Sequence, residues 1–106
     1  MIISGGENVS SIEVEDVLMS HPAVREAAVI GIPDEKWGEL VMALVVTDES
    51  SVSADDLISH CRESLAGYKC PKRVEFHETL PRTATGKLQK FKLREPFWAG
   101  RERRVH

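Results

Sequence analysis

The chain has 106 residues, of which 42% are hydrophobic and 29% are charged, and this composition suits one globular domain with a modest core. It has no apolar run long enough to cross a bilayer, and its two cysteines are too few for a disulfide framework or a cysteine metal site. These features exclude a membrane span and favour a reducing, cytoplasmic location.

Charge is distributed unevenly along the chain, although the net charge is only −3. Residues 1–66 carry thirteen acidic and three basic side chains, whereas residues 67–106 carry four acidic and eleven basic ones. A basic segment of this kind is typical either of a site for a phosphate-rich ligand or of a solvated surface with a basic tail. Charge alone favours the solvated surface.

The first twenty residues predict a short strand, a turn and a helix. The apolar segment Met1–Ile3 precedes a pair of glycines that marks a tight turn. Ser10 and Glu13 have the spacing of a capping box at the start of a helix. The apolar face of this helix would consist of Ile12, Val17 and Leu18. We expect the helix to end near His21, because a residue that precedes proline avoids the helical conformation.

Two apolar runs in the middle of the chain predict strands at Val24–Ile32 and Glu39–Thr47. The segment Gly31–Asp34 contains a proline and predicts a turn between them. Ser53 then begins a second helix as its N-cap, and Gly67 would close this helix as its C-cap. The buried face of the second helix would consist of Leu57, Ile58, Cys61 and Leu65.

The last third of the chain predicts a strand at Arg73–Glu78, a loop at Leu80–Gly86 and a short helix at Leu88–Arg94. Residues 95–106 would form a loosely ordered tail. This order of elements predicts one α+β domain over residues 1–106. Its small sheet would have about three main strands covered by helices, with a short N-terminal strand and loop.

The loop before the last helix ends in Gly86 and Lys87, which invites comparison with a phosphate-binding P-loop. A P-loop needs a glycine five residues before the glycine of its Gly-Lys pair, and a serine or threonine after the lysine. Here those positions hold Pro81 and Leu88. The loop is therefore no self-contained nucleotide site, and these residues alone favour an exposed surface lysine.

Other chemical signals are weak. The four histidines, His21, His60, His77 and His106, share no metal-ligand spacing, and no serine–histidine–acid arrangement is apparent. No helix-turn-helix or RNA-binding motif accompanies the basic segment. We therefore expect no metal site in this chain and no nucleic-acid partner.

Four segments, taken together, resemble adenylate-forming (AMP-binding) enzymes, a superfamily that covers acyl-CoA synthetases, luciferases and the adenylation domains of peptide synthetases. They occur in the order of that superfamily over residues 1–94: Met1–Val9, Val29–Asp34 followed by Trp37–Glu39, Tyr68–Lys72, and Leu80–Lys90. The resemblance is to the small C-terminal domain of these enzymes. The segment Phe97–Arg101 is similar to the tail of bacterial fatty-acyl-CoA ligases.

The resemblance implies a reaction in two steps. A carboxylate attacks the α-phosphate of ATP to give an acyl-adenylate and pyrophosphate, and CoA then attacks the adenylate after the C-terminal domain has rotated. Lys87 stands at the position of the lysine that serves the first step. An ammonium suits this task because it can contact both anionic reactants as negative charge builds up at phosphorus.

The resemblance also implies a CoA channel, with the turn at Gly5, Gly6 and Glu7 beside its pantetheine part. Trp37 would stack on the adenine of CoA. Its phosphates would meet the segment that contains Tyr68, Lys69 and Lys72. Position 70 holds a cysteine, whereas a basic residue there would suit a CoA phosphate better.

The substrates implied are ATP, CoA and a carboxylic acid, most simply a fatty acid. A large N-terminal domain, absent from these 106 residues, would bind ATP, the acyl group and Mg²⁺, for which this chain supplies no ligands. We expect this chain alone to be catalytically inert and to be mobile relative to that domain. The resemblance also implies a lysine acetyltransferase and a deacetylase as partners at Lys87. Acetylation would remove the charge that the first step needs.

Two other interpretations stay open. The chain could come from a peptide-synthetase adenylation domain or a luciferase-like enzyme, in which the acceptor is a carrier-protein thiol or oxygen instead of free CoA. Alternatively, it is a free-standing, non-enzymatic binding module. The segment Tyr68–Lys72 favours a CoA ligase.

Overall fold

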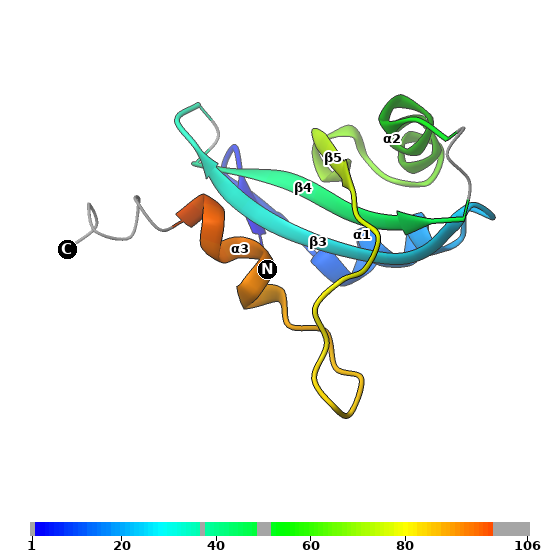
Figure 1. Ribbon diagram of the computed structural model, residues 1–106. Coiled ribbons are helices and arrows are strands. Elements are labelled where there is room, and N and C mark those ends of the chain that lie inside the picture. Colours follow the sequence, from blue (N-terminus) through cyan, green and yellow to red (C-terminus); the bar gives the residue numbers. More distant parts are fainter. Residues whose placement is uncertain (1, 37, 49–51, 99–106) are drawn as a thin grey trace.

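A computed structural model describes residues 2–36, 38–48 and 52–98 (Figure 1). Its elements in chain order are β1 (Ile2–Ser4), β2 (Glu7–Val9), α1 (Ser11–Met19), β3 (Val24–Asp34), β4 (Gly38–Thr47), α2 (Ala54–Ser64), the 3-10 helix η1 (Gly67–Lys69), β5 (Arg73–Phe76) and α3 (Lys90–Trp98). The α+β class predicted from the sequence is confirmed. Across the described ranges, no helix is long and apolar enough to span a membrane.

The sheet is built around β4. It runs in the order β2-β1-β4-β3, all antiparallel, and β5 pairs with β4 in parallel. Parallel pairing needs a long crossover, which α2 provides between β4 and β5. The three main strands predicted are β3, β4 and β5, and the predicted N-terminal strand and loop form the β1–β2 hairpin.

The central strand β4 is buried on both faces, which explains its uninterrupted apolar run. Val41, Ala43 and Val45 point into a core that α1 and α2 cover, through Val14, Leu18, Leu57 and Cys61. Met42, Leu44 and Val46 point into a second core, which α3 covers with Leu93. Figure 1 shows α2 and α3 on opposite sides of the β3–β4 ribbon.

The turn predicted at Gly31–Asp34 is wrong, because β3 continues through Asp34 in register with β4. Pro33 pairs with Glu39 inside this ladder. A proline is tolerated there because β3 is an edge strand, so the missing N–H can face away from the sheet.

The prediction that Ser10 is the N-cap of α1 is confirmed, since the hydroxyl of Ser10 accepts a hydrogen bond from the N–H of Glu13 at 3.3 Å. The helix ends at Met19, as the proline that follows His21 predicts. Its predicted face was wrong at Ile12, which is 67% exposed. Val14 and Leu18, four residues apart, point into the core instead.

The second helix begins with a complete capping box between Ser53 and Asp56. Leu57 and Cys61 are buried as predicted, and Leu65 packs against the same core, whereas Ile58 is only half-buried. The C-cap predicted at Gly67 is wrong. The helix ends earlier, where Leu65 adopts an extended backbone, and Gly67 begins η1.

The last helix begins at Lys90 and continues past Pro96 to Trp98, four residues beyond the predicted end. Phe97 packs against the second core, and the indole N–H of Trp98 donates to the carbonyl of Gly31 at 2.8 Å. These anchors hold residues 95–98 in the helix, although they were predicted to be loose. Residues 99–106 of the predicted tail lie outside the described residues.

Candidate functional site

The loop that carries Lys87 (residues 81–89, here called the lysine loop) connects β5 to α3 and has its own backbone structure. Arg82 and Leu88 form an isolated antiparallel bridge. The N–H of Thr83 donates to the carbonyl of Lys87 at 2.8 Å, and the N–H of Gln89 donates to that of Pro81 at 2.9 Å. The loop is therefore a small hairpin whose tip precedes Lys87.

The tip of the lysine loop is closed by Thr83 and Gly86. The hydroxyl of Thr83 accepts from the N–H of Lys87 at 3.0 Å, and its carbonyl accepts from the N–H of Gly86 at 2.9 Å. Gly86 has a φ of +89°, which glycine adopts without steric cost. Sequence reasoning missed the part played by Thr83, although a threonine four residues before the lysine signals such a turn.

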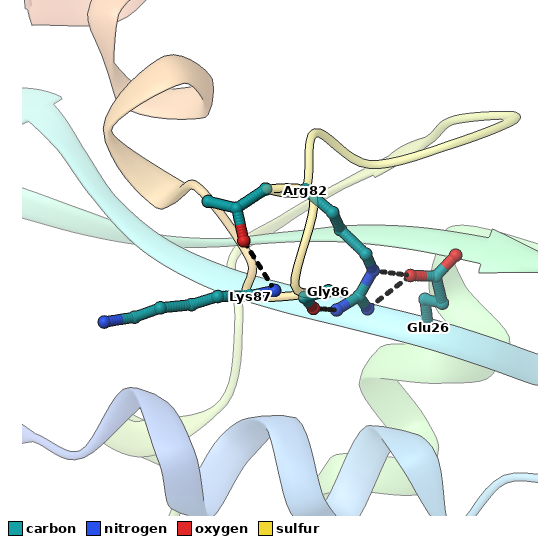
Figure 2. Close-up of polar contacts among 5 residues, drawn as sticks. Glu26, Arg82, Gly86 and Lys87 are labelled. Carbon is teal, nitrogen blue, oxygen red and sulfur yellow. Dashed lines mark hydrogen bonds and ion pairs between the residues drawn. The ribbon is translucent and has the colours of Figure 1, made fainter.

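Arg82 ties the lysine loop to the sheet. Its Nε donates to Oε1 of Glu26 at 2.8 Å, and its Nη2 donates to the same oxygen. The remaining Nη1 donates to the carbonyl of Gly86 at 2.8 Å. Figure 2 shows the guanidinium between the carboxylate of Glu26 on β3 and the residue that precedes Lys87.

A second anchor lies just after the lysine loop, at the start of α3. The ammonium of Lys90 pairs with Oε2 of Glu15 and donates to the hydroxyl of Ser11 at 3.2 Å. The same oxygen of Glu15 accepts from the N–H of Val29 at 2.8 Å. Both ends of the lysine loop are therefore tied to other elements, one to β3 and the other to α1.

The side chain of Lys87 itself is exposed and, within the part of the chain that the structure describes, its ammonium has no hydrogen-bond or ion-pair partner. Figure 2 shows it pointing away from Arg82 and Glu26. A cation with three free donors on a fixed backbone can bind an anion that approaches from outside this domain.

The β1–β2 turn holds the first of the predicted CoA-channel residues. Gly5 and Gly6 have φ values of 60° and 84°, and Ser4 pairs with Glu7 across the turn. A Cβ built on Gly6 would meet nothing within 4 Å. Because Ser4 also pairs with Gly38, the end of the β3–β4 hairpin lies next to this turn. Trp37 directly precedes Gly38 in the sequence and lies outside the described residues.

The other predicted CoA-channel residues lie in and after η1, which contacts β2. Tyr68 is 43% exposed, and the ammonium of Lys69 lies 5.8 Å from the centre of its ring. Lys69 is paired with Glu13 at 3.0 Å, and this hydrogen bond raises the pKa of Lys69. Lys72 is exposed. Cys70 is buried, and burial raises the pKa of its thiol.

The predicted residues thus fall into two groups. The β1–β2 turn, the end of the β3–β4 hairpin and η1 are joined by strand pairing and by contact between β2 and η1. The lysine loop projects from a different part of the domain, well away from the β1–β2 turn (Figure 1). Among the residues that the structure describes, no three histidine, cysteine or acidic side chains are grouped to hold a metal ion.

Comparisons with known proteins show the family to which this domain is similar. A model of the family described as AMP-binding enzyme C-terminal domain matches residues 13–87. The chain is 52% identical over 99 residues to the long-chain-fatty-acid–CoA ligase FadD13 of Mycobacterium tuberculosis, and the match covers 93% of this chain and 20% of that protein.

Solved structures share the fold. A Mycobacterium tuberculosis fatty acyl CoA synthetase superposes with a TM-score of 0.89 at 52% identity, over 94% of this chain and 20% of that one. The o-succinylbenzoate CoA synthetase of Bacillus subtilis, solved in complex with its acyl-adenylate intermediate, superposes with a TM-score of 0.81 at 49% identity, over 87% and 19%. The chain therefore spans about a fifth of the length of the relatives that it matches.

Proposed function

This chain belongs to the AMP-binding enzyme C-terminal domain family, and on that premise we propose that it is the mobile C-terminal domain of an ATP-dependent acyl-CoA synthetase. The enzyme would convert a carboxylic acid, ATP and CoA into acyl-CoA, AMP and pyrophosphate. The observation that carries this proposal is Lys87, whose ammonium has no partner among the described residues and extends from a loop that is anchored at both ends.

In the first step, an oxygen of the substrate carboxylate attacks the α-phosphorus of ATP, and the bond to the pyrophosphate oxygen breaks. Both reactants are anions, so a cation that contacts the carboxylate and an α-phosphate oxygen together stabilises the transition state. Lys87 is the residue we assign to this task. Its long side chain lets it reach across to a nucleotide held by the large domain, which the relatives' extra length would supply.

In the second step, the sulfur of CoA attacks the acyl carbon of the adenylate, AMP leaves, and the thiol loses its proton. The domain would rotate so that the β1–β2 turn replaces the lysine loop at the reaction centre. Two glycines without side chains let the backbone of this turn come close to the pantetheine chain. Tyr68, Lys69, Lys72 and Trp37 are assigned to the nucleotide part of CoA, with Lys69 first having to exchange its partner Glu13.

The acid is proposed to be a fatty acid, because the relative FadD13 is named for long-chain fatty acids. The o-succinylbenzoate CoA synthetase shows that a domain of this fold also serves an enzyme of a different acid. Mg²⁺ would accompany ATP on the large domain. The described residues of this chain group no three metal-ligating side chains, so no step is assigned to the ion here. We place the enzyme in the cytoplasm.

The decisive experiment replaces Lys87 in the full-length enzyme that contains this chain and measures adenylate formation from acid and ATP. We expect Lys87→Ala to slow this step by about 10²–10³-fold, the usual cost of losing one preorganised charge. Lys87→Gln, which mimics acetyl-lysine, should be similarly slow and would support acetylation as a control of activity. Lys87→Arg is the matched control that keeps the charge. Adenylate formation at the normal rate in Lys87→Ala would contradict the proposal.

A further inference from the structure

Glu26 stands out because it is an acidic residue within an apolar strand, and its carboxylate accepts two hydrogen bonds from Arg82, 56 residues away. We propose that Glu26 is a positioning residue for Lys87 that acts through Arg82. This inference rests on the proposed function of Lys87 in adenylate formation.

The path from Glu26 to Lys87 is short and consists of charged or geometrically fixed groups. The guanidinium of Arg82 is planar, so the two N–H groups that donate to Glu26 fix the direction of the third. This third group, Nη1, donates to the carbonyl of Gly86 at 2.8 Å. Gly86 lies directly before Lys87 and is the residue of the loop with the greatest backbone freedom. Holding its carbonyl therefore restricts the direction in which Lys87 leaves the loop.

A β-bulge puts Glu26 on the correct face of the sheet. Val24 pairs with Thr47 but Glu26 pairs with Val46, so β3 has one extra residue at this point. Val24 points into the core under α1 and α2, whereas Ala28, two residues after Glu26, points into the core under α3. Without the bulge, alternation would put Val24 and Glu26 on one face. With it, Glu26 faces the side of the lysine loop.

Partial exposure makes this pair better suited to positioning than to stability. The side chains of Arg82 and Glu26 are 42% and 30% exposed. Pairs as exposed as this add little to folding, but they restrict the geometry of the groups they join. Replacing Glu26 should therefore leave the fold intact while the lysine loop loses its connection to β3.

The test compares Glu26→Ala with Asp48→Ala in the full-length enzyme. Asp48 pairs with Arg25, the neighbour of Glu26 on β3, at 2.9 Å, so the control removes a similar ion pair that does not reach the lysine loop. We expect Glu26→Ala to lower kcat for adenylate formation roughly 10-fold. This loss is smaller than the cost of misplacing a catalytic group by 1 Å, which can reach about 10²-fold. The KM for ATP and the rate of thioester formation from premade adenylate should stay within about 2-fold.

Three further variants test whether Glu26 acts through Arg82. If the two residues act as one unit, Arg82→Gln should slow adenylate formation by a similar factor, and the double variant Glu26→Ala/Arg82→Gln should be no slower than either single one. Glu26→Gln, which keeps an acceptor oxygen, should lie between the wild type and Glu26→Ala. Independent, additive effects would overturn the proposed path.

The failures of the two proposals are distinguishable. If Lys87→Ala blocks adenylate formation but Glu26→Ala behaves like Asp48→Ala, then Glu26 does not position Lys87 and the proposed function stands. If Lys87→Ala itself has no effect, the proposed function is wrong and the positioning role is wrong with it. Equal slowing of both half-reactions by Glu26→Ala, together with a lower melting temperature, would mean that Glu26 has only a structural role.

Discussion

The lysine loop and the β1–β2 turn are both closed by backbone pairing, but the lysine loop is also tied at both ends by side chains of other elements. Side chains from β3 and α1 hold the two ends of the lysine loop through Glu26, Glu15 and Ser11, while Lys87 points away from Arg82 and Glu26. Backbone pairing forms the β1–β2 turn, whose two glycines have no side chain to anchor or to project.

This difference follows from what each region is proposed to do. A side chain that must meet two anions in one geometry gains from a fixed base, because orientation contributes directly to the rate. A turn that must let a long, thin substrate pass gains from having nothing that projects. The same small domain can therefore serve two reaction steps without sharing a residue between them.

The anchors of the lysine loop can be broken at Glu15. In Glu15→Ala, the N–H of the buried residue Val29 loses its acceptor at 2.8 Å, which should lower the free energy of unfolding by about 1–3 kcal/mol. Glu15→Gln keeps an acceptor and serves as the matched control, with a loss of less than about 1 kcal/mol. Urea denaturation of the two variants measures both. Equal losses would mean that the charge of Glu15, and not its hydrogen bond to β3, is what matters.

The β1–β2 turn can be filled at Gly6. A Cβ there meets nothing within 4 Å, so the domain itself leaves room for a larger side chain. Gly6→Ala and Gly6→Leu share the backbone strain of a φ of 84° and differ only in bulk. We expect Gly6→Leu to form thioester from premade adenylate about 10-fold more slowly than Gly6→Ala, equivalent to about 1.4 kcal/mol. Equal rates in stopped-flow assays would argue against a channel beside this turn.

The smallest predicted effect is on the pKa of Lys69, which, unlike Lys87, has an ion-pair partner among the described residues. Lys69 is paired with Glu13 in the structure, and this raises its pKa above the ordinary value of 10.5. The stabilisation from this pair is therefore present below pH 10.5 and is lost as the pH rises through the higher pKa of the folded state. In Glu13→Gln, an NMR titration should find the pKa of Lys69 back near 10.5. An unchanged pKa would mean that Glu13 is not its partner.

Local sequence signals predicted most of the elements but not the contacts between them. Ser10 and Ser53 were both predicted as N-caps, and both are confirmed, because a cap depends on residues only three positions apart. Pro33 was misread as part of a turn, because whether a proline fits a strand depends on the strand being at an edge. The indole of Trp98 stabilises the end of α3 by a hydrogen bond to the carbonyl of Gly31, 67 residues away. No local sequence pattern predicts a contact over that separation.

The residues of the candidate site also divide into those that a local segment predicts and those that depend on a long-range contact. The roles of Lys87 and of the glycine turn were predicted from the resemblance of four contiguous segments to the family, and they stay predictions. Glu26 and Arg82 were not connected in advance, because their pairing depends on a β-bulge that brings together residues 56 positions apart. An acidic residue within an apolar strand was the available signal, and it indicates a partner without saying which one.

The central claim is that the lysine loop and the β1–β2 turn serve different steps of one reaction. The most direct test measures both half-reactions, adenylate formation and thioester formation from premade adenylate, in Lys87→Ala and Gly6→Leu of the full-length enzyme. The account predicts that Lys87→Ala loses about 10²–10³-fold in the first step alone, and that Gly6→Leu is slowed in the second step alone. If either variant slows both steps equally, the two regions do not act separately and the account is contradicted.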